Sequence, residues 1–172
     1  MKLLDKFANV AVLVAVVVFL YVVTKDGYHS RISPKPGSPD ALVGTEVTLP
    51  GITLPSDRES IVLAISTWCR FCKENLPFYR ELSKEVQGKL SVFAILPQKP
   101  QEADQYIYGA GLQGVAVVSG DLKNIGVYAT PTLLLVDRSG RVKQAWVGEL
   151  DDDGQRQLVA SLALSRLTVS SH

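Results

Sequence analysis

The segment Ser66–Pro77, STWCRFCKENLP, contains both cysteines of the 172-residue chain, Cys69 and Cys72, with two residues between them. An apolar, β-branched run at residues 60–67, SIVLAIST, precedes the pair and is typical of a strand covered on both faces. Apolar residues recur at helical spacing after it, with Pro77 expected to kink the helix. A C-x-x-C pair between a strand and a helix favours redox chemistry.

This junction predicts different roles for the two sulfurs. The unpaired N–H groups and the dipole of a first helical turn favour a thiolate at Cys69, which makes it the expected nucleophile. Cys72 lies one turn further along, on nearly the same face and deeper, where it can attack a mixed disulfide formed at Cys69. We therefore predict that the two cysteines form a redox-active disulfide.

Other uses of a cysteine pair require further ligands. A structural zinc site needs about four ligands, but the chain has only these two cysteines, and its two histidines, His29 and His172, lie in a tether and at the end of the sequence. Covalent haem needs a histidine directly after the second cysteine, where Lys73 stands. We expect no metal and no cofactor. Copper(I), which accepts soft thiolate ligands, and a pair of inert buried thiols remain as alternatives.

The N-terminal part has a different composition from the rest. Residues 7–24, FANVAVLVAVVVFLYVVT, carry no charge, and a helix needs roughly 20 apolar residues to cross a bilayer. The run continues into KDGYHS without a small-x-small cleavage pattern, so we expect residues 1–24 to be an uncleaved membrane anchor rather than a signal peptide. Residues 25–40, with three prolines and two glycines, predict a flexible tether.

Residues 41–172 have the size of a single domain. Their order of patterns predicts an α/β fold with a mixed central sheet and helices on both faces. The expected elements are a hairpin at 46–55, strands at 60–67, 90–96 and 114–120, helices at 102–112, 122–128 and 151–167, and a hairpin at 131–150 that turns at 137–140.

Charge excludes one class of partner. The net charge is +1, 20% of the residues are charged, and lysines and arginines are scattered without a basic stripe. We therefore expect no nucleic-acid partner.

Two motifs give the sequence a family resemblance. WCRFC at 68–72, after an apolar strand, together with YATPTLLLVDRSGRV at 128–142, resembles the thioredoxin superfamily over residues 41–167. The resemblance is strongest to membrane-anchored, extracytoplasmic thiol-disulfide oxidoreductases of the TlpA-like and cytochrome c maturation type. It implies that Pro131 is a cis-proline facing the cysteines, that Thr130 offers its backbone to an extended substrate peptide, and that Trp68 is the family tryptophan beside the site.

The resemblance also implies a function and a location. The expected protein is a thiol-disulfide oxidoreductase that acts as a reductase on protein disulfides, including those of apocytochrome c, and that receives electrons from a membrane thiol donor. It would be a single-pass protein of the cytoplasmic membrane with its catalytic domain on the periplasmic side. The alternative from another class is a non-catalytic binding module with the same fold, or a copper-handling protein.

Some positions depart from the family pattern. Leu63 stands where many thioredoxins carry a buried acid, and Asn75 stands where several cytochrome-maturation members carry a glutamate. Asn75 can hydrogen-bond near Cys72 but cannot take its proton. Glu74 is the carboxylate that remains nearby, so the sequence leaves the proton acceptor open.

The dipeptide between the cysteines matches no subfamily signature. Its first residue, Arg70, places a cation near Cys69, which would favour the thiolate and make the disulfide a better oxidant. Its second residue, Phe71, is a candidate for an apolar rim against a protein substrate. We expect Arg70, Glu74 and Asn75 to modulate the site, and none of them fixes the direction of electron flow.

Overall fold

The computed structural model describes residues 38–169. The predicted anchor at 1–24 and nearly all of the predicted tether at 25–40 lie outside these residues. Within residues 38–169, no helix is both long enough and apolar enough to cross a membrane.

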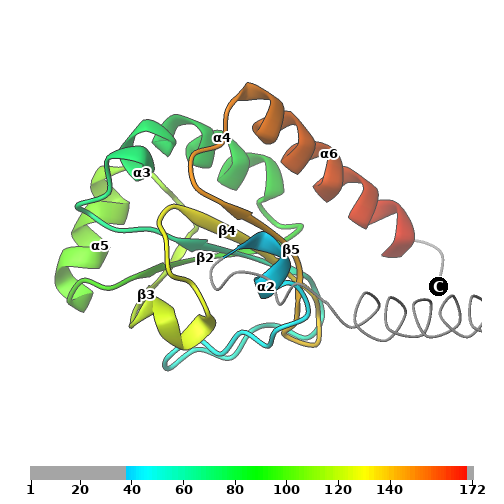
Figure 1. The fold of residues 1–172 in the computed structure, drawn as a ribbon, viewed down its shortest axis with the longest axis horizontal. Helices are drawn as coiled ribbons and strands as arrows, with labels where there is room; N and C mark the ends of the chain where they lie inside the picture. The colour runs from blue at the N-terminus through cyan, green and yellow to red at the C-terminus, as the bar shows by residue number, and fades with distance from the viewer. Residues whose placement is uncertain (1–37, 170–172) are drawn as a thin grey trace, which may run out of the picture. The chain divides into compact units, whose positions relative to one another are not determined.

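The described residues form an α/β fold around one mixed sheet (Figure 1). Its strands are β1 (Ser60–Ala64), β2 (Ser91–Leu96), β3 (Ala116–Ser119), β4 (Thr132–Val136) and β5 (Val142–Val147). The order across the sheet is β3-β2-β1-β4-β5. The first three strands are parallel, β4 is antiparallel to β1, and β5 is antiparallel to β4. Every residue of β1 and β4 is buried, which explains their unbroken apolar sequences. The predicted α/β fold with a mixed central sheet is confirmed.

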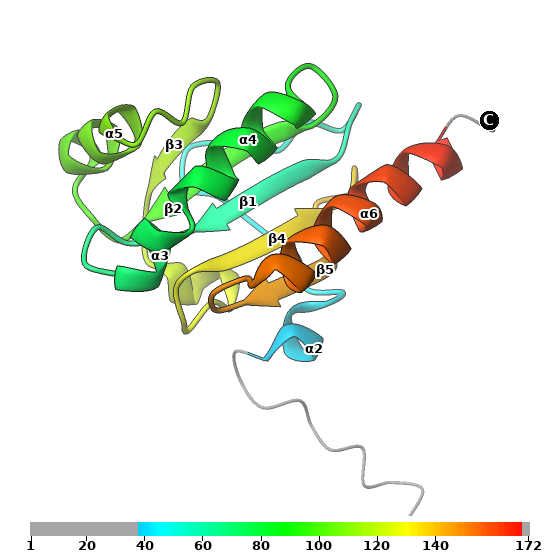
Figure 2. The same cartoon turned by 90° about the horizontal axis from the view of Figure 1, so that it is seen from above.

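Helices cover both faces of the sheet. They are α2 (Pro39–Leu42), α3 (Arg70–Glu74), α4 (Leu76–Val86), α5 (Pro100–Gly109) and α6 (Asp152–Val169), together with the 3-10 helix η1 (Leu122–Ile125). Figure 2 shows α4 and α6 side by side over the same face. Apolar residues of α3, α4, α5 and α6 pack on that face in a first core, and those of α2 and η1 pack in a second core on the other face. Alternate residues of β1 and β4 contribute to the two cores, as the period of a strand requires.

The helix that follows the cysteines is broken as predicted. Helix α3 ends at Glu74 and α4 begins at Leu76, and Asn75 between them stands at the C-cap position of α3 and the N-cap position of α4. Pro77 lies in the first turn of α4, where its missing N–H is not needed. The break lets α3 present the cysteines at the edge of the sheet while α4 packs across it.

Two segments differ from the sequence-based expectation. The predicted hairpin at 46–55 is only a tight turn with an isolated bridge between Leu49 and Ile52. Pro50 and Gly51, with φ +70°, occupy the central positions of this turn, which favours reversal over extended pairing. At the N-terminal end, the boundary drawn at Ala41 falls inside α2, whose Leu42 is buried in the second core.

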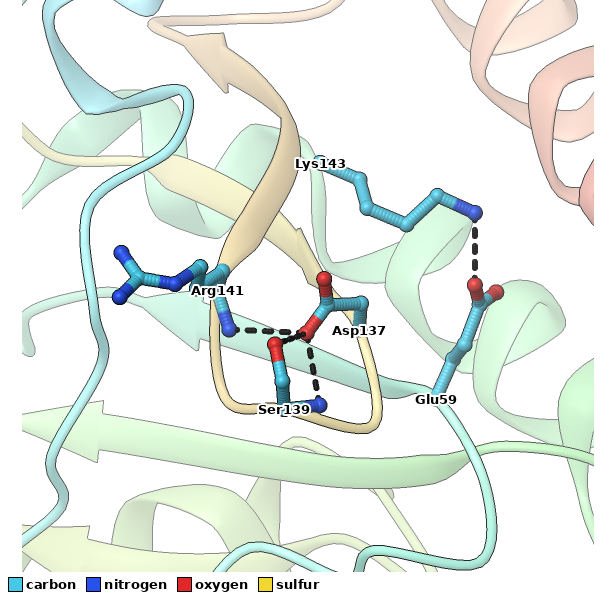
Figure 3. A network of polar contacts seen from close by, with 5 residues as sticks. All are labelled: Glu59, Asp137, Ser139, Arg141 and Lys143. Carbon is cyan, nitrogen blue, oxygen red and sulfur yellow. Dashed lines mark hydrogen bonds and ion pairs between the residues drawn. The ribbon is translucent and has the colours of Figure 1, made fainter.

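The predicted turn at 137–140 is confirmed and is held by one carboxylate (Figure 3). Asp137 Oδ1 accepts hydrogen bonds from the backbone N–H and hydroxyl of Ser139, at 2.8 and 2.6 Å, and from Arg141 N at 3.0 Å. Partial burial alone would raise the pKa of Asp137, but these hydrogen bonds outweigh it and lower the pKa below its ordinary value. Lys143 and Glu59 pair nearby at 2.6 Å.

Candidate functional site

The cysteines lie at one edge of the sheet, where several strands end or begin. The loop from Ser66 to Cys69 follows β1, Gln98 follows β2, and Thr130 lies two residues before the start of β4. Because β1 and β2 are parallel and β4 is antiparallel to β1, these segments meet at the same edge. The carboxyl ends of parallel strands are a common place for sites in α/β folds. The turn at Asp137 lies at the opposite edge, since Val136 pairs with Ser60 at the start of β1.

Cys69 and Cys72 form a disulfide, with their Cα atoms 5.2 Å apart. Cys69 caps the N-terminus of α3, and its Sγ accepts a hydrogen bond from Cys72 N at 3.1 Å. In the reduced protein this N–H faces the charge of a Cys69 thiolate, which it stabilises. Cys69 is partly exposed, whereas Cys72 is 0% exposed. Cys72 is thus the more buried of the two cysteines, as the sequence predicted.

The loop before β4 faces Cys69. The Thr130–Pro131 peptide bond is cis, as the resemblance implied. The carbonyl oxygen of Thr130 lies 3.3 Å from Cys69 Sγ, close enough to accept a hydrogen bond from a reduced thiol. Pro131 itself is buried. Thr130, the predicted substrate contact, thus has its carbonyl oxygen against Cys69 Sγ.

Exposed aromatic side chains lie in the segments around Cys69. Trp68 is 78% exposed and Phe71 48% exposed, so neither is a core residue. Tyr128, from the loop before β4, is also exposed. A cavity of about 210 Å³ lies between this loop and the residues after β2 and β3, lined by Tyr128 and Thr130 among others. Apolar rings and a hollow next to a reactive sulfur are features of a surface that receives a peptide chain.

The predicted modulators differ in their surroundings. Arg70 Nε donates to Glu74 Oε1 at 2.7 Å, and both side chains are exposed. The carboxylate of Glu74 offsets the cation that the sequence placed beside Cys69. Asn75 is 3% exposed and donates through Nδ2 to the carbonyl of Phe71 at 3.1 Å, while its Oδ1 has no partner among residues 38–169.

The core around Cys72 is apolar. Leu63, at the position of the family acid, is buried in the first core together with Cys72 and Tyr79. Burial, with a smaller contribution from Tyr106, raises the pKa of Tyr79 well above its ordinary value, so its phenol stays neutral. Neither residue can take the proton of Cys72.

The sequence did not identify two further candidate residues of the site, Ser66 and Gln98. Ser66 Oγ accepts hydrogen bonds from Trp68 N at 3.3 Å and from Gln98 Nε2 at 3.2 Å, and its carbonyl accepts from Cys69 N at 3.1 Å. A serine and a glutamine in loops match no motif. Their place in the predicted sheet could have indicated them, because Gln98 follows a strand expected to lie parallel to the strand before Cys69.

A metal at this site would depend on the cysteines. In the part of the chain that the structure describes, no three histidine, cysteine or acidic residues are grouped so as to hold a metal ion. A copper site would therefore have to use Cys69 and Cys72 without further ligands of these types from residues 38–169.

Comparison with known proteins gives matches at the level of structure. No protein-family model matches the sequence, and no curated protein sequence matches it. Among solved structures, a candidate thiol:disulfide interchange protein DsbE from Chlorobium tepidum is similar, with a TM-score of 0.56, 21% identity, and coverage of 70% of this chain and 96% of that one.

Two further structures are similar to the same part of the chain. A thiol-disulfide isomerase from Corynebacterium glutamicum has a TM-score of 0.55 and 19% identity over 72% of this chain and 97% of that one. The exposed lipoprotein thioredoxin Etrx1 from Streptococcus pneumoniae has a TM-score of 0.51 and 17% identity over 68% and 99%. The chain therefore has a thioredoxin-like fold, with a C-x-x-C pair at the start of the helix after β1.

Proposed function

We propose that this protein is a thiol-disulfide oxidoreductase that exchanges disulfides with protein partners through Cys69 and Cys72. The observation that carries the proposal is the unequal placement of the two sulfurs. Cys69 Sγ is accessible, accepts the Cys72 N–H at 3.1 Å and faces the Thr130 carbonyl at 3.3 Å, while Cys72 is buried one turn behind it. The similar structures of thiol-disulfide proteins support the proposal.

In the reducing direction, the Cys69 thiolate attacks one sulfur of a substrate disulfide. The substrate disulfide breaks, its other sulfur leaves as a thiolate and takes up a proton, and a mixed disulfide forms at Cys69. Cys72 then attacks Cys69 Sγ, the bond between Cys69 and the substrate breaks, and the departing substrate thiolate takes up the proton that Cys72 gives up. The substrate disulfide is reduced by two electrons, and the cysteine pair is oxidised by the same two.

The surface beside Cys69 defines how a substrate would bind. An extended segment lying along Tyr128–Thr130 would place its cysteine against Cys69 and a neighbouring side chain in the cavity lined by Tyr128 and Thr130. Trp68 and Phe71, both exposed, would contact apolar residues of the same segment.

We propose further that the domain works as a reductase outside the cytoplasm, held by a membrane anchor at residues 1–24, with apocytochrome c among its substrates. The resemblance to anchored cytochrome c maturation proteins supports this, as does the similarity to a lipoprotein described as exposed. The Arg70–Glu74 pair is consistent with reduction, because an offset cation stabilises the thiolate less and makes the disulfide a weaker oxidant. A redox potential of about −270 mV for the Cys69–Cys72 pair supports a role as reductase, and one of about −120 mV contradicts it.

The exchange mechanism is tested by trapping. The reduced full-length chain carrying Cys72→Ser, treated with glutathione disulfide, should hold one glutathione on Cys69, detected by mass spectrometry. The matched variant Cys69→Ser should stay unmodified, because Cys72 is buried. Equal labelling of the two variants would exclude the proposed roles. If neither variant is labelled and the parent forms no reversible disulfide, the protein is a binding module instead.

A further inference from the structure

A buried polar cluster lies behind the loop that carries Cys69. Its central residue is Gln98, which follows β2 and is 3% exposed. Gln98 Nε2 donates to Ser66 Oγ at 3.2 Å, and the backbone carbonyl of Gln98 accepts a hydrogen bond from the hydroxyl of Ser119. Since Ser66 follows β1 and Ser119 ends β3, a single residue links the carboxyl ends of three parallel strands.

Ser66 connects Gln98 to the backbone of Trp68 and Cys69. Its Oγ also accepts from Trp68 N at 3.3 Å, and its carbonyl accepts from Cys69 N at 3.1 Å. The two residues at the start of the C-x-x-C segment are therefore oriented by Ser66, whose side chain is in turn oriented by Gln98. The hydrogen bond from Cys72 N to Cys69 Sγ depends on the same backbone, because Cys69 is the cap of α3.

Of the two polar atoms in the side-chain amide of Gln98, only Nε2 has a hydrogen-bond partner among residues 38–169. Its Oε1 is buried and has no hydrogen-bond partner among residues 38–169. A buried acceptor without a partner lowers stability, and an apolar side chain of similar size at this position would avoid that cost. Packing alone does not account for a glutamine here, whereas the bond from Nε2 to Ser66 does.

We propose that Gln98 is a positioning residue for the Cys69–Cys72 exchange site, and that it acts through Ser66 on the backbone before Cys69. The inference rests on the proposed function, since it assigns a role in the reactivity of Cys69. Without the Gln98–Ser66 bond, the Trp68–Cys69 segment moves relative to α3, and the Cys72 N–H stabilises the Cys69 thiolate less well.

The test separates reactivity from stability. It uses the full-length chain in a Cys72→Ser background, so that Cys69 is the one reactive sulfur, and compares Gln98→Met with the parent. We expect the midpoint of the pH profile of Cys69 alkylation by iodoacetamide to rise. The rate of reaction with glutathione disulfide at pH 7 should fall roughly three- to tenfold, less than the 10²-fold cost of a misplacement near 1 Å. The thermal unfolding midpoint should be unchanged or higher.

Three further variants complete the test. Gln98→Asn, whose amide is one methylene too short to reach Ser66, should slow Cys69 as Gln98→Met does, and it serves if the methionine variant does not fold. Ser119→Ala, the control, removes the other bond of the cluster and should leave the alkylation profile unchanged. In a Ser66→Ala background, Gln98→Met should have no further effect, because the connection is already broken.

Two results would overturn the inference. One is an alkylation profile in Gln98→Met and Gln98→Asn identical to that of the parent, and the other is an effect of Gln98→Met that persists undiminished with Ser66→Ala. The alkylation profile is measurable whether or not the parent exchanges disulfides. A failure of the proposed function would appear in the parent, and a failure of the Gln98 role would appear in the difference between variants.

Discussion

At the scale of single residues, some features of the site follow from the C-x-x-C motif, and others arise only when the chain folds. Cys69 and Cys72 are identifiable from their spacing, and the accessible and buried positions follow from the start of a helix after a strand. The ion pair between Arg70 and Glu74 depends on the helix as well as on the two residue types, because side chains four residues apart meet only if the helix forms. The charge near Cys69 is therefore set by both residues.

Glu74→Gln is expected to favour the thiolate of Cys69. The change removes a negative charge and leaves the Arg70 cation unpaired near Cys69. The midpoint of Cys69 alkylation should move to lower pH by less than about one unit, because water and salt screen exposed charges. Glu81→Gln is the matched control, since Glu81 forms a similar exposed pair with Lys84 further along α4. A midpoint that rises, or that moves equally in the control, would contradict this reading of the Arg70–Glu74 pair.

At the scale of elements, each strand and helix depends on local sequence, but their ends depend on particular side chains. The β4–β5 hairpin shows this most directly, because the three hydrogen bonds to Asp137 hold its turn and Gly140 there has φ +82°. The lowered pKa of Asp137 means that folding favours its ionised form.

Asp137→Ala is expected to destabilise the domain by about 1–2 kcal/mol, as does the loss of other side-chain caps to backbone N–H groups. Because the folded pKa is below the unfolded one, the contribution of Asp137 is complete above its ordinary pKa of 3.8 and is lost as the pH falls through the folded pKa. Urea unfolding at pH 7 and at pH 3 measures this. The difference between the parent and Asp137→Ala should shrink at pH 3.

The exposed neighbour provides the control for this prediction. Arg138→Ala changes a residue of the same turn and should alter the free energy of unfolding by no more than about 0.5 kcal/mol. A difference between the parent and Asp137→Ala that stays constant between pH 7 and pH 3 would show that the carboxylate is not what holds the turn.

Sequence patterns identified the elements better than their connections. The buried strands, the break near Pro77 and the turn at Asp137 all depend on residues close together in the chain, which is why they were predictable. The segment 46–55 has the alternation of a hairpin, yet Pro50 and Gly51 make it a tight turn. Gln98 was not predictable as a partner of Ser66, because its role arises only when β1 and β2 lie side by side.

At the scale of the whole molecule, two cores on opposite faces of the sheet hold the site in place. The first core contains Cys72, so one of the two cysteines of the site is itself part of the packing. The second core is closed by α2, which lies against β5 and inserts Leu42. The folded domain therefore includes residues that composition alone assigns to the edge of the tether.

Leu42→Ala is expected to destabilise the domain by roughly 2–4 kcal/mol, because it removes a buried side chain and leaves a cavity in the second core. Val43→Ala is the matched control, since Val43 is exposed and should change stability by no more than about 0.5 kcal/mol. Urea unfolding of the full-length chain gives both values. Equal small effects of the two substitutions would mean that α2 does not contribute to the folded domain.

The burial of Cys72 also constrains the order of events in the proposed cycle. Every partner, whether it gives or takes electrons, has to form its bond with the same sulfur of Cys69, beside the same Thr130 carbonyl. Donor and substrate therefore cannot be bound productively at once, and each must leave before the other enters. The expected kinetics are those of a double-displacement enzyme, in which the two partners compete for a single docking position.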